Sequence, residues 1–456
     1  MLEPVLKFLD DDASNALERL QTLLRIPSVS TDPQYGDQVA EAAGWVADAM
    51  ASIGLDARIE QTDGHPIVLG HARPDDVMAD GPRVLYYGHY DVQPPDPIDA
   101  WTSPPFEPQV RDGALYARGA SDDKGQVCTI LEALRAWRQV HGKWPVPVSV
   151  IIEGEEECGS VNLPKFVAAH RDELNAQFVA ISDTGMWDRQ TVAITYGLRG
   201  VQFFNVELHG PNRDLHSGVY GGAVANPAVV LCRVLGGLFD EHRRVTIPQF
   251  YDDVATLTEA QREAWRGLGF DEHRQLLGPA GVDRPIGEAG FSTLERRWAR
   301  PSCDINGLYG GYMGAGTKTI VPSFAGAKVS FRLAPNQRSE HIGRQFHAWL
   351  ESHDVEGCRW KIEQLGSADP IIMPTDAPYM AAAQRAVERT SGRSAVLIRE
   401  GATLPILTDF KSILGLDCLL LGFGLADDRI HAPDEKFDLA CFALGCRTHA
   451  ALLAEL

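Results

Sequence analysis

The stretch VLYYGHYDVQP, residues 84–94, decides both the fold and the position of the candidate site. Its first four residues are an apolar run of the kind that fills the centre of a sheet. The character of the chain changes at Gly88, after which His89 and Asp91 stand two residues apart. Because residues i and i+2 of an extended segment point to the same side, this strand delivers an imidazole and a carboxylate together as it leaves the core.

Further strands and helices alternate along the chain around this stretch. VPVSVII (146–152), QFVAIS (177–182) and LDCLLLGFG (416–424) are apolar runs of strand length. TILEALRAWRQV (129–140) and MAAAQRAVERTSG (380–392) have apolar residues at helical spacing. Strands separated by helices predict right-handed crossovers and a mostly parallel α/β sheet.

The pattern changes near residue 197. GLRGVQFFNVELHG (197–210) and AKVSFRLAP (327–335) alternate apolar and polar residues, as half-exposed antiparallel strands do. Helices are expected at 226–241 and 338–353, and the Gly-, Pro- and Asp-rich residues 366–378 are typical of a crossing between domains. We therefore predict an α/β domain formed by residues 1–197 and 369–456, interrupted by an inserted α+β domain of residues 198–368.

Composition excludes several classes of partner. The 456 residues are 44% hydrophobic and 23% charged, which is typical of a globular protein. A net charge of −20 argues against nucleic acid or an anionic membrane surface as the main partner. Residues 1–20 are typical of an amphipathic helix rather than a signal peptide, and no apolar run is long enough to span a membrane. The eight cysteines contain no C-x-x-C pair, which indicates a cytoplasmic location.

Acidic and histidine residues gather where the predicted strands end. In open α/β sheets ligands bind beyond the carboxyl ends of the strands. So many carboxylates in one crevice repel one another unless cations neutralise them. Two imidazoles among oxygen ligands suit zinc or manganese better than calcium. The residues at these ends are His89, Asp91, Asp122, Asp123, Glu155, Glu156, Glu157, Asp183 and His431.

Each of these residues also has a simpler interpretation when taken alone. A histidine at a strand end is commonly a hydrogen-bonded surface residue, and Asp122 and Asp123 stand where a helix N-cap is expected. The acidic triplet at 155–157 is typical of a solvated turn, and Asp183 of a turn residue. Their joint placement favours a metal site. There His89 can bind a metal while Asp91 orients it, and one of the adjacent Glu156 and Glu157 can be a ligand while the other serves as a base.

The motifs themselves resemble a known family. GHYDVQP, ARGASDDKG, EGEEECGS, ISD, ITYGLRG, DLHSGVYGG and IHAPDEK occur in the order found in the co-catalytic dinuclear metallopeptidases, which include carnosinase, carboxypeptidase G, tripeptidase and succinyl-diaminopimelate desuccinylase. The sequence is most similar to the branch of cytosolic nonspecific dipeptidase and carnosinase. The resemblance covers residues 84–436 and implies an aminopeptidase/phosphorylase-like catalytic domain carrying a lid and dimerisation domain.

The resemblance implies a role for each residue of the catalytic domain. Two divalent ions, zinc or manganese, would be bound in each subunit. Glu156 would be the general base and Asp91 would steer His89, and a cis peptide would follow the bridging aspartate. The metal ligands would be Asp122 as the bridge, His89 and Asp183 at one ion, and Glu157 and His431 at the other.

The inserted domain and one late loop would supply further residues. His216 would reach the partner subunit's active site and support the oxyanion, and Thr319 would approach from the partner in the same way. Arg332 would bind the terminal carboxylate of the substrate, a task that suits its planar fork; alone, it is equally typical of a solvent-facing arginine on an exposed strand. In EGATLP (400–405), Ala402 and Thr403 replace the usual glycine–serine pair of a loop that contacts substrate.

EGEEECGS also departs from the family at two positions. Glu155 is an additional acid that either raises metal affinity or is simply exposed, and Cys158 is expected to be a packed thiol rather than a nucleophile.

The sequence therefore predicts a metal-dependent dipeptidase, and the resemblance implies that it forms a homodimer. It would hydrolyse dipeptides, or very short peptides with a free C-terminus, with a metal-bridging water activated by Glu156. Two alternatives remain open. One is an N-acyl-amino-acid deacylase or desuccinylase acting on another small amide, and the other is a non-catalytic peptide-binding protein, although the base and all five ligand positions are present.

Overall fold

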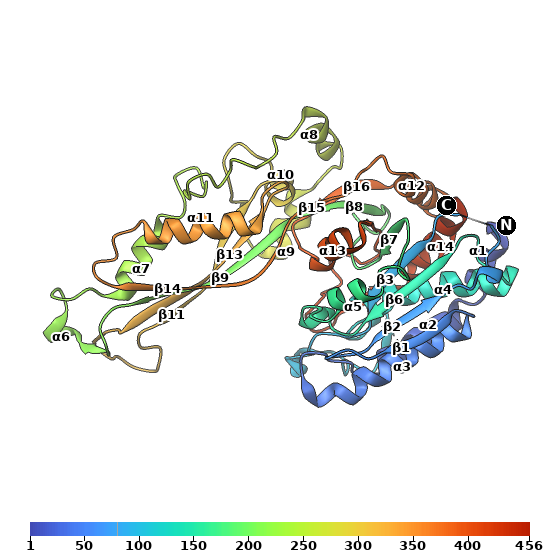
Figure 1. Ribbon diagram of the computed structural model, residues 1–456, viewed down its shortest axis with the longest axis horizontal. Coiled ribbons are helices and arrows are strands. Elements are labelled where there is room, and N and C mark those ends of the chain that lie inside the picture. The colour runs from blue at the N-terminus through green and yellow to red at the C-terminus, as the bar shows by residue number, and fades with distance from the viewer. Residues whose placement is uncertain (80) are drawn as a thin grey trace. The chain divides into compact units, whose positions relative to one another are not determined.

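The apolar run that begins at Val84 forms β3 (Val84–His89), and all six of its residues are buried. The computed structural model describes residues 1–79 and 81–456. In that part of the chain β3 lies inside a nine-stranded sheet of order β1-β2-β6-β3-β7-β17-β8-β15, with β16 also paired to β8 (Figure 1). The other strands are β1 (Asp56–Glu60), β2 (Ile67–His71), β6 (Val148–Glu153), β7 (Phe178–Ile181), β8 (Ala193–Leu198), β15 (Ile371–Ile372), β16 (Val396–Glu400) and β17 (Asp417–Leu420).

The centre of this sheet is parallel. β6, β3, β7 and β17 run in the same direction, whereas β1, β2, β8 and β15 pair antiparallel at the two sides. Parallel strands need crossover connections, and α4 (Lys124–His141) provides the one between β3 and β6. The prediction of a mostly parallel α/β sheet is therefore confirmed.

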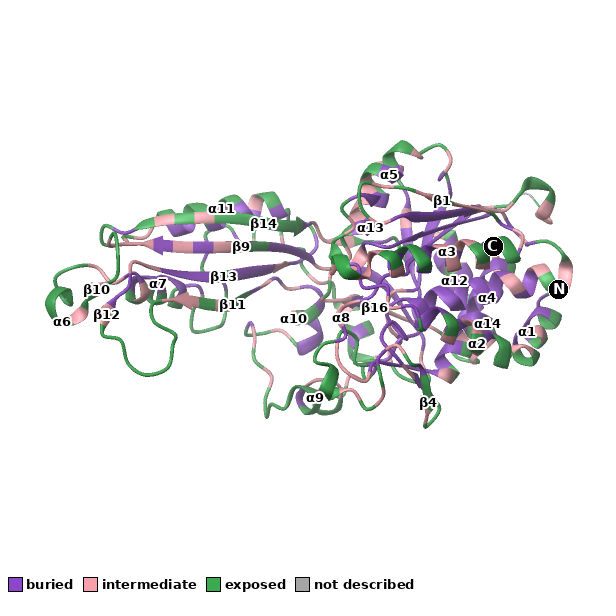
Figure 2. Ribbon diagram, turned by 90° about the horizontal axis from the view of Figure 1, so that it is seen from below, coloured by how far each residue is buried: buried purple, intermediate pink, exposed green. Residues whose placement is uncertain are grey.

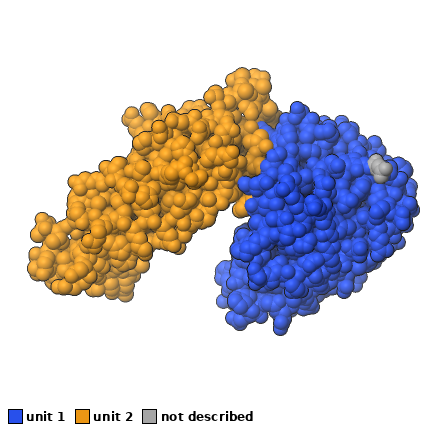
Figure 3. Space-filling model, in the orientation of Figure 1, with its two compact units in different colours: residues 1–196, 373–398, 406–456 blue, residues 197–372, 399–405 orange. Residues whose placement is uncertain are grey.

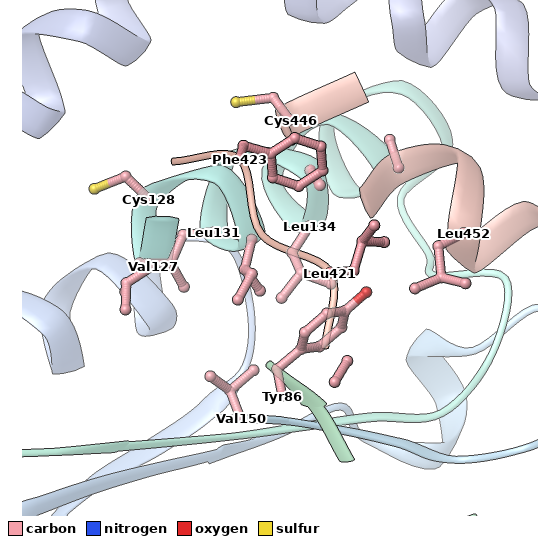
Figure 4. Close-up of a cluster of buried hydrophobic side chains, with 14 of the residues drawn as sticks. Tyr86, Val127, Cys128, Leu131, Leu134, Val150, Leu421, Phe423, Cys446 and Leu452 are labelled. Atoms are coloured by element: carbon pink, nitrogen blue, oxygen red, sulfur yellow. The ribbon is translucent and has the colours of Figure 1, made fainter. Parts of the chain in front are cut away.

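Helices cover both faces of the sheet because its strands are apolar on both sides. On one face Tyr86 and Val150 point toward Leu131 and Leu134 of α4 in a continuous apolar cluster (Figure 4). On the other face the ring of Tyr87 packs edge to face on Phe410, with ring centroids 5.4 Å apart. The helices are α1 (Leu2–Asp11), α2 (Ala13–Leu24), α3 (Gly36–Ser52), α5 (Leu163–Ala169), α12 (Pro378–Ser391), α13 (Pro405–Asp409) and α14 (Leu439–Glu455).

The chain divides into two compact units (Figure 3). Unit 1 contains residues 1–196, 373–398 and 406–456, and unit 2 contains residues 197–372 and 399–405. Residues 197, 369–372 and 399–405, which the sequence analysis assigned to the α/β domain, thus group with unit 2. One reason is that the hydroxyl of Thr403 donates to the carbonyl of Arg199, a residue of the same unit, at 2.6 Å.

Unit 2 is built on a four-stranded antiparallel sheet of order β11-β13-β9-β14. The inner strand β13 is buried over most of its length, whereas the edge strand β14 is largely exposed (Figure 2). One sheet face packs on helices through Phe204, Phe331 and Phe346. The strands are β9 (Gly200–His209), β11 (Ser302–Gly310), β13 (Phe324–Leu333) and β14 (Arg359–Ala368), and the helices α6 (Ser217–Tyr220), α7 (Pro227–Gly236), α8 (Glu259–Arg266), α9 (Gly278–Ala280), α10 (Thr293–Trp298) and α11 (Ser339–Glu351).

Two small sheets complete the structure. β10 (Leu215–His216) pairs with β12 (Ile320–Val321) in unit 2. In unit 1, β18 (Lys436–Asp438), β5 (Ala114–Tyr116) and β4 (Gln109–Arg111) form a three-stranded sheet. No helix in the described residues is both long enough and apolar enough to cross a membrane.

The prediction of one N-terminal amphipathic helix is wrong in one respect. The segment forms two helices, α1 and α2, that are separated at Asp12, where the backbone leaves helical geometry. The carboxylate of Asp12 is bound by the guanidinium of Arg19 at 2.6 Å, which anchors the break. Both helices still bury an apolar stripe, with Val5 and Leu20 fully buried.

Candidate metal centre

The candidate site is built at the carboxyl ends of the parallel strands. His89 is the last residue of β3 and lies opposite Glu153 of β6, and Tyr87 lies opposite Ile181 of β7. This register brings the ends of three strands to the same edge of the sheet. Glu156 and Glu157 follow the end of β6, and Asp183 follows the end of β7, at this same edge.

The first group of ligand atoms comes from His89, Asp122 and Asp183, which offer atoms within 4.8 Å of one another. Nε2 of His89 lies 3.1 Å from Oδ1 of Asp122 and 4.0 Å from Oδ2 of Asp183. His89 is fully buried, whereas Asp183 is only half-buried. The group is therefore open on the side of Asp183.

The second group shares Asp122 with the first and adds Glu157 and His431. Nε2 of His431 lies 2.8 Å from Oδ2 of Asp122 and 3.3 Å from Oε2 of Glu157. His431 comes from the loop between β17 and β18 and has a φ of 62°, in the left-handed region. The two oxygens of Asp122 thus face two different histidines, which is the arrangement of a carboxylate that bridges two sites.

Asp91 lies behind His89, on the side away from Asp122. Its Oδ1 is 3.3 Å from Nδ1 of His89, and its Oδ2 accepts hydrogen bonds from Oγ of Ser30 at 2.6 Å and from the backbone N–H of Glu157 at 3.0 Å. A carboxylate in this position fixes the tautomer and the orientation of a ligating imidazole. Tyr90, between the two, points the other way into the core, where its hydroxyl donates to the carbonyl of Pro66.

The histidines and Asp122 shift one another's pKa values. Burial lowers the pKa of His89, but hydrogen bonds to Asp122 and Asp91 outweigh burial and raise this pKa well above its usual value. Hydrogen bonds to Asp122 and Glu157 raise the pKa of His431 to about 10. Burial alone raises the pKa of Asp122, yet the two histidines hold it far below its ordinary value. The ionised carboxylate of Asp122 is stabilised here by the two imidazoles.

Glu156 differs from its neighbour Glu157. It begins the short 3₁₀ turn Glu156–Cys158 and is half-buried. Burial raises the pKa of its carboxyl to about 8; His89 opposes this shift, and the negative charge of Asp183 reinforces it. A carboxyl whose pKa is raised toward neutrality, beside a set of ligand atoms, has the properties of a general acid–base group.

The donor set fits divalent ions. Oxygen and imidazole ligands in two groups that share one carboxylate match the requirements of zinc and manganese. Oε1 of Glu157 and Oδ1 of Asp123 are buried without a hydrogen-bond partner. Buried carboxylate oxygens of this kind are costly unless a cation binds nearby. Oδ2 of Asp123 accepts a hydrogen bond from the backbone N–H of His89 at 3.2 Å, and its side chain does not cap α4. The predicted cis peptide between Asp122 and Asp123 is confirmed.

The sequence analysis missed a buried carboxylate that holds two ligand segments together. Glu435 is fully buried, and its Oε1 accepts from the backbone N–H groups of Ser121 at 2.9 Å and Asp122 at 3.1 Å. Its Oε2 accepts from Arg118 at 2.6 Å and from the N–H of Gly119 at 3.1 Å. Since Glu435 lies four residues after His431, it ties the loop of His431 to the backbone of Asp122.

We expect Glu435→Gln to weaken metal binding by about 10–100-fold, as is typical for residues that support ligands. An amide cannot accept from four donors in the same way, so the backbone of Asp122 loses part of its support. The measurement is the metal dissociation constant by competition with a chromogenic chelator. The exposed Glu107→Gln is the matched control, and equal metal affinity in both variants would contradict the role of Glu435.

Two residues of EGEEECGS differ from expectation. Glu155 neither joins the ligand atoms nor is exposed; it is buried, and it accepts hydrogen bonds from the backbone N–H groups of His65 at 2.8 Å and Asn162 at 3.1 Å. The prediction of a packed thiol at Cys158 is wrong, because the residue is exposed at the end of the 3₁₀ turn. The turn directs Glu157 inward and leaves the next side chain outside.

The remaining predicted residues lie in unit 2, where they form two local groups. His216 and Thr319 are both exposed, and they come together because β10 pairs with β12 and the N–H of Ser217 donates to the carbonyl of Thr319. Arg332 donates to Oγ1 of Thr403 at 3.0 Å. Ala402, beside Thr403, is exposed. Thus Thr403 has definite hydrogen-bond partners, whereas the methyl group of Ala402 can make only apolar contacts.

Comparisons with known proteins agree with this geometry. The chain matches the family model described as Peptidase family M20/M25/M40 over residues 85–455. It is 32% identical to the Cys-Gly metallodipeptidase dug1 of Schizosaccharomyces pombe, with 100% of this chain and 98% of that protein covered. It is 30% identical to the Beta-Ala-His dipeptidase of Homo sapiens, with 100% and 93% covered. Among solved structures, the M20 family metallo-carboxypeptidase Sso-CP2 from Sulfolobus solfataricus has a TM-score of 0.85 at 30% identity, over 96% of this chain and 98% of that one.

Proposed function

The chain belongs to peptidase family M20/M25/M40 and is a metal-dependent hydrolase, and from this premise we propose that it cleaves the peptide bond of dipeptides with Glu156 as the general base. The observation that carries the proposal is the position of Asp122. Its two carboxylate oxygens face His89 and His431, each of which belongs to a separate group of ligand atoms.

We propose that five residues hold two divalent ions. When bound, such ions polarise the scissile carbonyl and lower the pKa of water toward neutrality. Asp91 keeps the ring of His89 in one orientation, and Gln93 supports Glu157 by donating to its Oε2 at 2.8 Å. The ligands are Asp122, shared by both ions, with His89 and Asp183 for one and Glu157 and His431 for the other.

Glu156 would accept a proton from the attacking water and pass it to the amine of the leaving residue. Its raised pKa supports both directions of transfer: a carboxyl of much lower pKa would be too weak a base to accept the proton, and one of much higher pKa would be too weak an acid to return it. His216 would support the oxyanion of the tetrahedral intermediate, with Thr319 beside it. Both residues would act from the partner subunit of a homodimer, as the family resemblance implies.

Arg332 would bind the free carboxylate of the substrate. It alternates along β13 with the buried residues Phe331 and Leu333 and therefore points away from the core of unit 2. Among the described residues it forms no ion pair, and its hydrogen bond to Thr403 leaves further N–H groups for a ligand. The loop of Ala402 and Thr403 would contact the substrate next to it. We also propose zinc or manganese as the metal and the cytoplasm as the location.

A substrate panel tests this function. We expect protein that has been stripped of metal to be inactive, and protein reconstituted separately with zinc, manganese or cobalt to hydrolyse Cys-Gly or β-Ala-His. Their C-terminal amides should react poorly, because Arg332 would lose the carboxylate that it binds. The panel also contains tripeptides and N-acyl and N-succinyl amino acids. The measurement is kcat/KM for each substrate by product chromatography.

The alternatives predict different results. Faster turnover of N-acyl or N-succinyl amino acids than of any dipeptide would identify a deacylase or desuccinylase. Faster turnover of tripeptides, with release of the C-terminal residue, would indicate a carboxypeptidase. Absence of hydrolysis with every metal, in protein shown to contain it, would favour a peptide-binding protein.

A further inference from the structure

Unit 2 contains a cavity of about 450 Å³ that is lined by charged side chains. These side chains have no role in the proposed hydrolysis. Its floor is the edge strand β11, which contributes Ser302, Asp304 and Ile305. Its walls come from the segments around residues 239–245 and 286–288 and from the end of α10. Five arginines line it: Arg199, Arg243, Arg296, Arg297 and Arg300.

Acidic residues compensate only part of this charge. Glu288 is buried, and Arg300 holds it with two hydrogen bonds of 2.7 Å from Nε and Nη2. Arg244 lies 3.8 Å from the same carboxylate. Asp304, the other acid of the lining, is exposed and forms no ion pair among the described residues. Glu288 is therefore already neutralised, and two further carboxylates remain for the other four arginines: exposed Asp304, and Glu400, which interacts with Arg297.

Those four arginines have few partners of their own. Nη1 of Arg199 makes only long contacts, at 3.3–3.5 Å, to two carbonyls and to Oγ of Ser302, and its Nε is buried without a hydrogen-bond partner. Arg296 uses Nε to bind the carbonyl of Glu288. For Arg243 and Arg297, the described residues offer no side-chain hydrogen bond or ion pair. Several guanidinium groups thus remain available to a ligand.

The arginines also repel one another. Burial lowers the pKa of Arg199 to about 10, and the positive charges of Arg332 and Arg297 lower it further in the same direction. Burial also lowers the pKa of Arg297, whose side chain is partly exposed, and the carboxylate of Glu400 opposes this shift. Buried cations are costly unless an anion pairs with them. In a chain whose net charge is −20, such a local excess of positive charge is not a general property of the surface.

We propose that this pocket binds a small organic or inorganic dianion, a dicarboxylate or a phosphate group. Guanidinium groups bind both through paired N–H donors in a planar fork. Phe239, Val245 and Ile286 supply an apolar wall against which the carbon skeleton of a ligand can pack. The proposal does not depend on the peptidase function, because its residues contain no metal ligand, no base and none of the residues assigned to substrate.

The test compares anion binding by two double variants of the full metal-loaded protein. Arg243→Gln with Arg297→Gln removes two pocket charges whose side chains form no hydrogen bond or ion pair among the described residues. Arg274→Gln with Arg284→Gln removes the same charge from exposed positions elsewhere in unit 2. Inorganic phosphate and glutarate are titrated separately by calorimetry at constant ionic strength, with acetate as the monoanion.

We expect the wild type and the control variant to bind phosphate, glutarate or both saturably, and the pocket variant to bind at least about tenfold more weakly, because two charge-assisted contacts are lost. Binding of phosphate alone would identify a phosphate group as the ligand, and binding of glutarate alone would identify a dicarboxylate. Any phosphate that binds to the metal ions should bind equally to the pocket variant. The difference between the wild-type and pocket-variant titrations therefore measures binding to the pocket. Equal binding in all three proteins, or no binding beyond that of acetate, would overturn the proposal.

Discussion

Replacing Glu156 by Gln is expected to lower kcat for dipeptide hydrolysis by about 10²–10⁴-fold, the contribution typical of general acid–base catalysis. The amide has nearly the same shape but cannot accept and return a proton. Glu156 belongs to neither group of ligand atoms, so both metal ions should stay bound. The measurement combines kcat from a coupled amine assay with metal content by elemental analysis on the same protein sample.

Glu107→Gln provides the matched control, because it makes the same chemical change at an exposed position of unit 1. It should keep both the rate and the metal content of the unaltered protein. If Glu156→Gln retained full activity with its metals bound, another group would have to be the base. If it lost its metals, Glu156 would be a ligand instead.

Asp122→Asn is expected to remove both ions together and to lower activity by about 10³-fold, since the ions contribute several kcal/mol of transition-state stabilisation. The amide offers one oxygen, whereas the carboxylate presents Oδ1 to His89 and Oδ2 to His431. The loss should therefore affect both groups of ligands. Metal content and thermal stability in the presence of added zinc are the measurements.

Glu157→Gln distinguishes a bridging ligand from an ordinary one. Glu157 belongs only to the group that contains His431, so its replacement should release one ion and spare the other. The same partial loss of metal in Asp122→Asn would show that Asp122 serves a single ion. Circular dichroism of each variant separates loss of metal from loss of fold.

Much of the fold could be predicted because its core strands are continuous apolar runs. β3 and β6 were recognised to within two residues, and the family, the fold class and the dipeptidase type of activity are confirmed by the comparisons. The predicted bounds of strands and helices are less accurate where the side chains are small. β13 begins at Phe324 rather than at Ala327, because Ala325 and Gly326 show no alternation of polarity. Similarly, α7 ends at Gly236, before a second glycine, although the prediction continued to residue 241.

The site was predictable only where the chain itself shows a pattern. His89 and Asp91 are two residues apart, Glu156 and Glu157 are neighbours, and each pair follows a strand. The structure places His89, Glu156 and Glu157 close to Asp122, Asp183 and His431. Ser30 carries no such signal, because it meets Asp91 across 61 residues of chain. Glu435 could be read as one more charge in IHAPDEK, and only the folded chain reveals its four donors. The roles of the ligands, of His216 and of Arg332 stay predictions.

The distribution of the ligand residues along the chain has a consequence for biosynthesis. Four of them, from His89 to Asp183, precede unit 2, whereas His431 and its supporting Glu435 follow it. When the ribosome has synthesised all of unit 2, the second group of candidate ligands still lacks His431. The candidate metal centre therefore cannot be complete in the nascent chain before His431 has been synthesised. A chain cut anywhere in the loop before His431 would be a lasting form of that intermediate, with one set of ligands complete and the other without its imidazole.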